Sequence, residues 1–246
     1  MICRAALAAA ALSLAWPGLG ACGDPAPPPV CGATRAGAAS PHAQCGDTLD
    51  FTPINQYQGA IGSIQDREDA VALLDGDCTG TLIAAEAGPV VLTAGHCVAL
   101  GDAVLVAFNV EDNPDGDTLV TGGTVTEQSD EPDYALVELD RIPRIAPTPL
   151  TTRHSDRLAV IQHPRGAPKV IAEGDLAGAC NRQLYYSDLD TLVGSSGAGV
   201  LNDTGYLLGV HTDGDCGKNG GTNRGWTAEA IVAASAYLQD ADLADR

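Results

Sequence analysis

Short apolar segments, separated by turn-forming residues, run through most of the chain from residue 60 onward. Segments of about four to eight residues, bounded by Gly, Pro, Asn or Asp, are typical of β-strands. The 29 Gly and 15 Pro residues supply the turns that many short strands need. We therefore predict an all-β protein, with strands near Ala60–Ile64, Ala70–Leu74, Gly80–Ala84, Val90–Thr93, Val104–Phe108, Leu119–Thr126, Ala135–Leu139, Ala159–Gln162, Lys169–Ala172, Leu184–Tyr186 and Leu207–Val210.

A helical spacing of apolar residues is found near the C-terminus. Ile231, Ala234 and Leu238 follow one another at intervals of three and four residues. That spacing places side chains on one face of an α-helix. The pattern predicts a helix from Ala228 to Gln239.

The segment GSSGAG, residues 194 to 199, consists of Gly, Ser and one Ala. Such segments are usually loops or linkers. Its flanks, DTLV before it and VLNDTGYLLGVH after it, indicate a strand on one side and a strand, turn and strand on the other. A linker does not fit between two core strands. We interpret the small residues as a tight turn that brings backbone N–H groups close to a reactive hydroxyl.

A hydroxyl is a weak nucleophile at neutral pH, so it needs a base, and the base needs an orienting group. The chain has five histidines, namely His42, His96, His154, His163 and His211. In VVLTAGHC, an aliphatic strand ends in a small-residue turn that presents His96, and Cys97 can tether this turn. In EPDYALVELD, Asp133 stands at the mouth of an apolar strand and could be held against an imidazole. An isolated Asp in that position would more often only be solvated.

Taken together and in this order, CTGTLI…VVLTAGHC, PDYALVEL and GSSGAGV…LLGVH resemble the motifs of a trypsin-like serine protease. The chain is most similar to the bacterial branch that includes the glutamyl and lysyl endopeptidases, which shares the Gly-x-Ser-Gly core and a segment like DCGKNGGTNRG. The resemblance runs from about Gly59 to Leu238. It implies two packed six-stranded antiparallel β-barrels (chymotrypsin-like) with a C-terminal α-helix, an active site between them, and a crossover near residues 144–153.

The resemblance also implies a role for each motif residue. His96 corresponds to the general base, Asp133 to its orienting group and Ser196 to the nucleophile. Ser196 is preferred to Ser195 because it occupies the nucleophile position of the motif. The backbone N–H groups of Gly194 and Ser196 correspond to the oxyanion hole.

These residues predict a serine endopeptidase that cleaves peptide bonds through an acyl-enzyme intermediate. Two alternatives remain open. Gly95 stands where many relatives have Ala, and Ala198-Gly199 stands where many have a small residue and Pro, so the chain could be an inactive or weakly active protease-fold binding lipoprotein. It could also be an esterase-type acyl hydrolase, because the same triad attacks any accessible acyl carbon.

The resemblance to glutamyl endopeptidases suggests a substrate-binding role for Thr191 and His211. A hydroxyl and an imidazole can donate hydrogen bonds to a carboxylate, which favours a Glu side chain before the cleaved bond. A preference for Lys or Arg would need a carboxylate, and Asp213 or Asp215 near the pocket rim could provide one. Alternatively, His211 only packs beside the triad.

The N-terminus is predicted to be a targeting segment. Arg4 is followed by an apolar stretch, Ala5 to Gly20, which is interrupted by Pro and is short for a membrane-spanning helix of about 20 residues. The stretch ends in LGAC, which resembles the bacterial lipobox and makes Cys22 the expected lipidation site. Ordinary signal cleavage after Ala21 is the alternative.

The expected organisation follows from this targeting segment. Residues 1–21 form the signal peptide, residues 22–45 a lipid-anchored tether rich in Pro, Ala and Gly, and residues 46–246 the protease domain. The protein would then be exported as a cell-envelope lipoprotein, periplasmic or on the cell surface, or else secreted. We expect a monomer that reaches the membrane only through its lipid anchor.

Eight cysteines indicate disulfide chemistry in an exported chain. Without Cys3 in the signal and Cys22, six remain: Cys31, Cys45, Cys78, Cys97, Cys180 and Cys216. The resemblance implies the pair Cys78–Cys97. The other four could pair as Cys45–Cys216 with Cys31–Cys180, or as Cys31–Cys45 with Cys180–Cys216. No Cys-x-x-Cys or His-x-x-x-His spacing is present, so we expect no metal site and no cofactor.

The chain is strongly acidic, with a net charge of −19. This charge argues against nucleic acid and against anionic lipid as partners, since both are polyanions. The expected partner is a peptide or protein substrate.

Overall fold

The structure is a computed structural model, and it describes residues 42–218, 220–239 and 241–244. The predicted signal peptide, the expected lipidation site Cys22 and nearly all of the predicted tether lie outside these residues. Within the described part of the chain, no helix is both long and apolar enough to cross a membrane.

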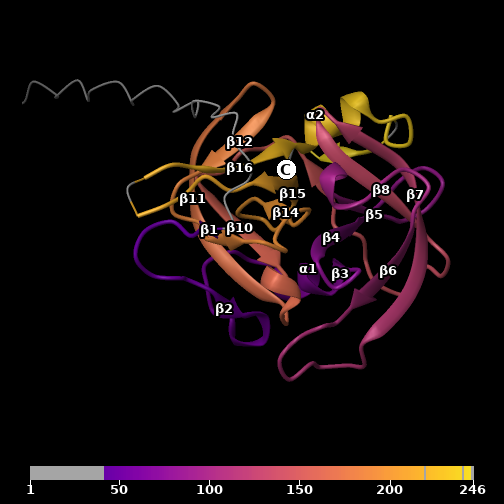
Figure 1. The fold of residues 1–246 in the computed structure, drawn as a ribbon, viewed down its shortest axis with the longest axis horizontal. Coiled ribbons are helices and arrows are strands. Elements are labelled where there is room, and N and C mark those ends of the chain that lie inside the picture. Colours follow the sequence, from indigo (N-terminus) through magenta and orange to yellow (C-terminus); the bar gives the residue numbers. More distant parts are fainter. Residues whose placement is uncertain (1–41, 219, 240, 245–246) are drawn as a thin grey trace, which may run out of the picture.

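Six antiparallel strands close the first barrel, on the right of Figure 1. In chain order they are β3 (Val71–Leu74), β4 (Cys78–Ile83), β5 (Val90–Thr93), β6 (Ala103–Phe108), β7 (Leu119–Asp130) and β8 (Asp133–Leu139). Their order around the barrel is β3-β4-β5-β8-β7-β6. Apolar side chains fill the interior, among them Leu74, Leu82, Val91, Val106, Phe108 and Val137.

Six more strands form the second barrel, on the left of Figure 1. They are β10 (Arg157–Gln162), β11 (Val170–Cys180), β12 (Gln183–Tyr186), β14 (Gly199–Leu201), β15 (Leu207–Asp213) and β16 (Asn223–Thr227). The ring closes because β14 pairs with both β10 and β15. The two barrels of the prediction are therefore confirmed.

Shorter elements connect and flank the barrels. The short strands are β1 (His42–Ala43), β2 (Thr52–Pro53), β9 (Leu150–Thr151), β13 (Thr191–Leu192) and β17 (Leu243–Ala244). The helices are α1 (Ile64–Arg67), α2 (Ala228–Ala234) and the 3-10 turns η1 (Ile54–Gln56), η2 (Glu68–Ala70), η3 (Gly95–Cys97) and η4 (Pro164–Gly166). Helix α2 packs on β15 and β16.

One apolar cluster joins the two barrels. It combines Leu92 and Leu136 of the first barrel with Ile161 and Val210 of the second, and Ile231 of α2 packs onto it. Burial of this shared surface holds the barrels together. The cleft between them is thus built on a continuous core.

Three secondary-structure predictions need correction. Ala60–Ile64 is not a strand, because Ile64 begins α1 and its side chain is buried there. Strand β16 was not predicted, since Asn223 and Arg224 break its apolar pattern. The remaining correction concerns the C-terminal helix, which is shorter than predicted.

Helix α2 ends at Ala234 rather than at Gln239. The backbone of Ser235 is extended, and its Oγ accepts hydrogen bonds from the backbone N–H groups of Tyr237 and Leu238. These bonds satisfy donors that a continued helix would have used. Leu238 is still fully buried, so its apolar character reflected burial rather than helix.

A buried ion cluster connects the barrels on another side. The Lys169 ammonium, just before β11, lies 2.5 Å from Glu68 Oε2 in η2 and 2.7 Å from Glu111 Oε1 after β6. The Lys169 side chain is completely buried. Burial raises the pKa of Glu68 above its ordinary value, and the Lys169 charge opposes this rise. The stability of this cluster therefore depends on the ammonium group of Lys169, which is the cation that balances the two carboxylates.

We expect Lys169→Met to lower the free energy of unfolding by about 3–5 kcal/mol at pH 7, because it leaves two buried carboxylates without their cation. The change is measured by urea denaturation. Arg157→Met is the matched control, since its ion pairs with Glu173 and Asp175 are partly exposed and should be worth less than about 1 kcal/mol. If both variants had the same free energy of unfolding, the buried ion cluster would not contribute the expected stability.

Candidate active site

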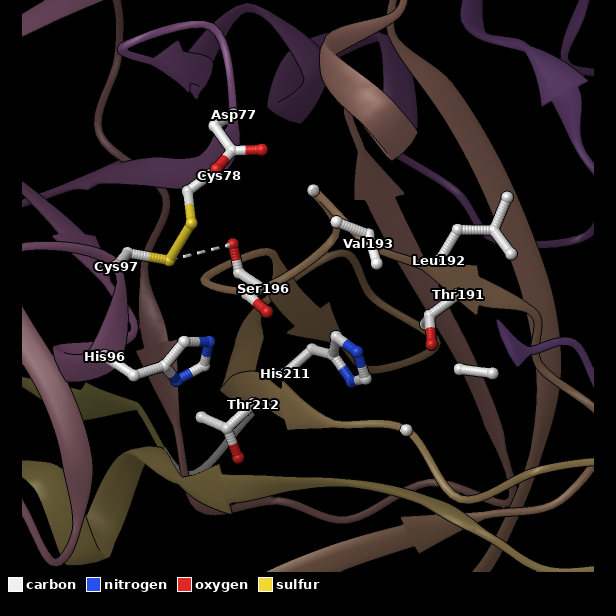
Figure 2. A pocket seen from close by; sticks show the side chains of 13 residues that line it. Asp77, Cys78, His96, Cys97, Thr191, Leu192, Val193, Ser196, His211 and Thr212 are labelled. Atoms are coloured by element: carbon white, nitrogen blue, oxygen red, sulfur yellow. Dashed lines mark hydrogen bonds between the residues drawn. A yellow bond between two sulfur atoms is a disulfide. The ribbon is translucent and has the colours of Figure 1, made fainter. Parts of the chain in front are cut away.

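One pocket lies where the two barrels face each other, and residues of both line it (Figure 2). Asp77, Cys78, His96 and Cys97 come from the first barrel. From the second come Thr191, Leu192, Val193, Gly194, Ser196, His211, Thr212 and Gly214. In Figure 2 the side chain of Ser196 lies between the rings of His96 and His211. The pocket thus gathers His96, Ser196, Gly194, Thr191 and His211, which the sequence singled out.

His96 and Asp133 are in contact. Strand β5 runs into the η3 turn, which carries His96, and Asp133 begins the neighbouring strand β8. Asp133 Oδ2 lies 2.7 Å from His96 Nδ1, and Asp133 Oδ1 accepts a hydrogen bond of 3.0 Å from the His96 backbone N–H. Two contacts from one carboxylate fix both the ring and the turn that carries it.

Gly95 makes this close approach possible. A Cβ atom at this position would overlap the carbonyl oxygen of Ser129 and crowd that of Tyr134. An Ala at this position would force these strands apart in this chain. The departure at Gly95 is therefore matched by the local packing.

The carboxylate also sets the protonation of the imidazole. The hydrogen bond to Asp133 raises the pKa of His96, while burial acts in the opposite direction. With Nδ1–H donating to Asp133, the neutral ring keeps its lone pair on Nε2. That nitrogen is the one available as a proton acceptor.

The segment between β13 and β14 is bent tightly around Ser196. Gly194 and Gly197 have φ angles of +93° and +85°, a conformation that side chains other than that of Gly rarely adopt. Thr79 of β4 donates from its backbone N–H to Ser196 O (2.9 Å) and from Oγ1 to Gly194 O (2.8 Å). The first barrel therefore holds the loop that the second barrel presents.

The two adjacent serines have different environments. Ser195 is fully buried, and its Oγ accepts a hydrogen bond of 3.0 Å from the Leu192 backbone N–H. Ser196 lines the pocket. Of the two hydroxyls, only that of Ser196 faces the space that also contains His96.

Two disulfides support this region. Cys78–Cys97 joins β4 to the η3 turn, and Cys45–Cys216 joins the N-terminal segment to the chain after β15. The expected Cys78–Cys97 pair is confirmed. Cys45–Cys216 excludes the alternative in which Cys45 pairs with Cys31. Cys180 is disulfide-bonded too, and Cys31, its partner in the remaining arrangement, lies outside the described residues.

Residues 78–210 match the family model of the trypsin-like peptidase domain, and this match covers more than half of the chain. This chain belongs to the trypsin-like peptidase family. The matched residues include His96, Asp133 and Ser196, whereas His211 lies just beyond the match. No curated protein matches the sequence.

Solved structures with the same fold are distant in sequence. The serine endoprotease from Yersinia pestis is 18% identical with a TM-score of 0.56, covering 78% of this chain and 69% of its own. A human pathogenic astrovirus serine protease is 22% identical with a TM-score of 0.51, covering 65% and 90%. The MamO protease domain from Magnetospirillum magneticum is 14% identical with a TM-score of 0.55, covering 69% and 97%. At these identities the likeness supports the fold.

A peptide plane beside Ser196 is held in one orientation. Val193 O accepts a hydrogen bond of 2.6 Å from the backbone N–H of Arg165 in η4. In a trans peptide the C=O and N–H groups point in opposite directions, so the Gly194 N–H points away from Arg165. Arg165 itself has a φ of +59°, a rare conformation for a residue with a side chain. No pattern in the sequence indicated this contact.

Polar groups line the inner wall of the peptidase pocket. Thr191 is fully buried, and its Oγ1 has no hydrogen-bond partner among the described residues. His211 Nδ1 lies 2.5 Å from Tyr186 Oη. Burial lowers the pKa of His211 to about 4 and raises that of Tyr186 well above 10. At pH 7 the phenol therefore donates to Nδ1, and the neutral ring carries its proton on Nε2.

Two of the carboxylates near this pocket have partners, whereas the exposed Asp77 lines the pocket itself. Asp213 lies 3.1 Å from the Arg224 guanidinium, and Asp215 is exposed and does not line the pocket. Asp190, directly before Thr191, accepts hydrogen bonds of 2.6 Å from the backbone N–H groups of Cys45 and Asp50. The sequence analysis did not single out Asp190, which adjoins Thr191 but does not itself line the pocket.

Proposed function

We propose that the protein is an exported serine endopeptidase with His96 as general base, Asp133 as its orienting group and Ser196 as nucleophile. One observation carries the proposal: Asp133 fixes the imidazole of His96 in the pocket that Ser196 lines, while Ser195 is turned inward. The family membership supports the same assignment.

The geometry suggests how each group acts. Ser196 Oγ attacks the acyl carbon while His96 Nε2 takes its proton. The N–H groups of Gly194 and Ser196 stabilise the oxyanion of the tetrahedral intermediate. His96 then gives its proton to the leaving amine, and water hydrolyses the acyl-enzyme with His96 again as the base.

An inactive, binding function is the first alternative. It rested on the unusual Gly95 and Ala198-Gly199. A Cβ atom at Gly199 would crowd Leu207 and Thr81, so Gly fits the packing there as it does at Gly95. Gly95 and Gly199 therefore fit the packing of this chain, which supports an active site without testing it. Labelling by a fluorophosphonate, an irreversible serine-hydrolase probe, separates an active from an inactive site.

An esterase is the second alternative, since the chemistry of the triad does not distinguish acyl donors. A peptide library compared with matched p-nitrophenyl esters tests this point. Hydrolysis of esters without cleavage of any peptide would favour the esterase and contradict the proposal.

We further propose that the pocket prefers a Glu side chain before the cleaved bond, as in the glutamyl endopeptidases that the sequence resembles. The free Thr191 hydroxyl and the neutral His211 ring offer hydrogen-bond donors, with the backbone carbonyl of Arg224 as a competing acceptor for the ring. A preference for Lys or Arg would need an unpaired carboxylate. Asp190 and Asp213 have partners, whereas the exposed Asp77 lines the pocket on the side of the first barrel and makes this preference the competing outcome.

Thr191→Val is the sharpest test of this preference. Removing one hydrogen bond to a charged group should lower kcat/KM for a peptide ending in Glu by about 10- to 100-fold. Val keeps the shape of Thr and removes a buried hydroxyl without a partner, so the melting temperature should stay the same or rise. Matched peptides ending in Glu, Lys, Phe and Ala give the comparison.

His211→Ala provides the second variant in the same assay. Because His211 is bonded to Tyr186, its loss also disturbs the core, and its effect is interpreted only beside the melting temperature. A wild-type preference for Lys, or a Glu preference unchanged in both variants, would contradict the assignment.

Export and anchoring are proposed from the N-terminal sequence, with lipidation at Cys22. The mass of the mature N-terminal peptide decides this proposal. A diacylglycerol-modified peptide that begins at Cys22 supports it, and an unmodified N-terminus contradicts it.

A further inference from the structure

The segment His42–Cys45, hereafter the N-terminal arm, lies against the substrate pocket. It precedes the residues that match the peptidase family. Its strand β1 pairs antiparallel with β13, so that His42 stands opposite Leu192 and Ala43 opposite Thr191. Thr191 and Leu192 line the pocket, and Ala43 lines it as well. The arm therefore extends the pocket wall by one strand.

Ala43 fits closely against Gly214, another residue of the pocket wall. A Cβ atom at Gly214 would overlap the Cβ of Ala43. Both residues line the pocket, and Ala43 is only 3% exposed. Ala43 and Gly214 thus touch each other in the pocket wall, and a larger side chain at either position would clash with the other residue.

Buried polar groups hold the arm in this position. Asn223, fully buried, donates from Nδ2 to Ala43 O (2.8 Å) and to Leu189 O (2.9 Å). The buried carboxylate of Asp190 accepts from the Cys45 N–H, and Cys45 is also bonded to Cys216. A strand of two residues would not stay docked on its own. These three anchors make it a fixed part of the second barrel.

We propose that the N-terminal arm is a permanent wall of the primary specificity pocket and that Ala43 is a specificity-determining residue. The inference rests on the peptidase function proposed above. The small Ala43 packs against Gly214 in the pocket wall. A larger residue at this position has no room on the Gly214 side, so it displaces the wall or enters the pocket and narrows the space for the substrate side chain, while the proposed catalytic groups His96 and Ser196 stay as they are.

The test compares Ala43→Leu with Gln44→Leu. Successive side chains of an extended segment point to opposite faces, and Gln44 does not line the pocket, so the second variant adds the same side chain outside it. We expect Ala43→Leu to lower kcat/KM for peptides ending in Glu by about 100-fold or more, since even one methylene changes such ratios by about 10- to 200-fold. For peptides ending in Gly, kcat/KM should change by less than about threefold, because they have no side chain to place in the pocket. Gln44→Leu should leave kcat/KM unchanged for both kinds of peptide.

Ala43→Gly covers the case in which Ala43→Leu does not fold, which its melting temperature would reveal. Removing the methyl group widens the pocket and should raise kcat/KM for peptides ending in the longer Phe relative to Ala by about tenfold. Fluorophosphonate labelling of Ser196 should proceed at the wild-type rate in every folded variant.

The outcomes separate this inference from the proposed function. An active wild type with the same side-chain preference in the folded Ala43 variants overturns the role of the arm alone. A wild type that neither hydrolyses peptides nor reacts with the fluorophosphonate overturns the peptidase function, and the inference with it.

Discussion

Replacing Ser196 by Ala is expected to lower kcat for peptide hydrolysis by about 10⁴- to 10⁶-fold. The variant lacks the hydroxyl that we propose as the nucleophile, so it could not form the proposed acyl-enzyme. The loop should keep its shape, because Thr79 holds Gly194 and Ser196 through their backbone carbonyls rather than through the Ser196 side chain. Progress curves on one peptide give kcat, and the melting temperature shows that the fold is intact.

Ser195→Ala is the matched control for Ser196→Ala. The Ser195 hydroxyl accepts a hydrogen bond from the Leu192 N–H inside the protein, so its removal leaves a buried donor unsatisfied. This variant should lose about 1–3 kcal/mol of stability and keep its hydrolysis per folded molecule. Wild-type rates in Ser196→Ala, or loss of activity in folded Ser195→Ala, would contradict the assignment of the nucleophile.

Asp133→Asn should lower kcat by about 10⁴-fold. In the structure, Asp133 accepts hydrogen bonds from both Nδ1 and the backbone N–H of His96. Asn has one oxygen acceptor and one NH₂ donor, so it favours the ring with its proton on Nε2. The base would then present a proton to Ser196 instead of a lone pair.

The pH dependence gives a second readout for the same variant. His96 must be neutral to accept a proton, so activity should fall as the pH drops below its pKa, which the hydrogen bond to Asp133 raises above 6.5. In Asp133→Asn the carboxylate no longer favours the charged ring, so this pKa should move to lower pH. NMR titration of the His96 ring measures the shift directly. An unchanged His96 pKa would mean that Asp133 does not act on the ring.

The local parts of the fold could be predicted from the sequence. Val90–Thr93 is a short β-branched and aliphatic run, and it forms strand β5 with these bounds. Asn223–Thr227 carries no such pattern, and it is a strand because β12 and β15 pair with it on either side. The end of α2 was missed for a related reason: Ser235 is engaged by Glu127, a residue of the first barrel.

In the candidate site, too, features within one short segment could be predicted, whereas contacts between distant segments could not. The motifs around His96, Asp133 and Ser196 each lie within a few residues, so the sequence displays them. The position of Asp190 depends on amides about 140 residues earlier in the chain, at Cys45 and Asp50. No pattern within one segment could show that this carboxylate is occupied, or that the arm forms part of the pocket.

The most direct measurement is to map the fluorophosphonate adduct by mass spectrometry of the intact protein and of its peptides. A trypsin-like peptidase with this triad should carry one adduct, on Ser196, in the wild type and in Ser195→Ala. The adduct should be absent from Ser196→Ala and form far more slowly in His96→Ala. An adduct on Ser195, labelling that does not depend on His96, or a wild type that does not react would contradict the proposed active site.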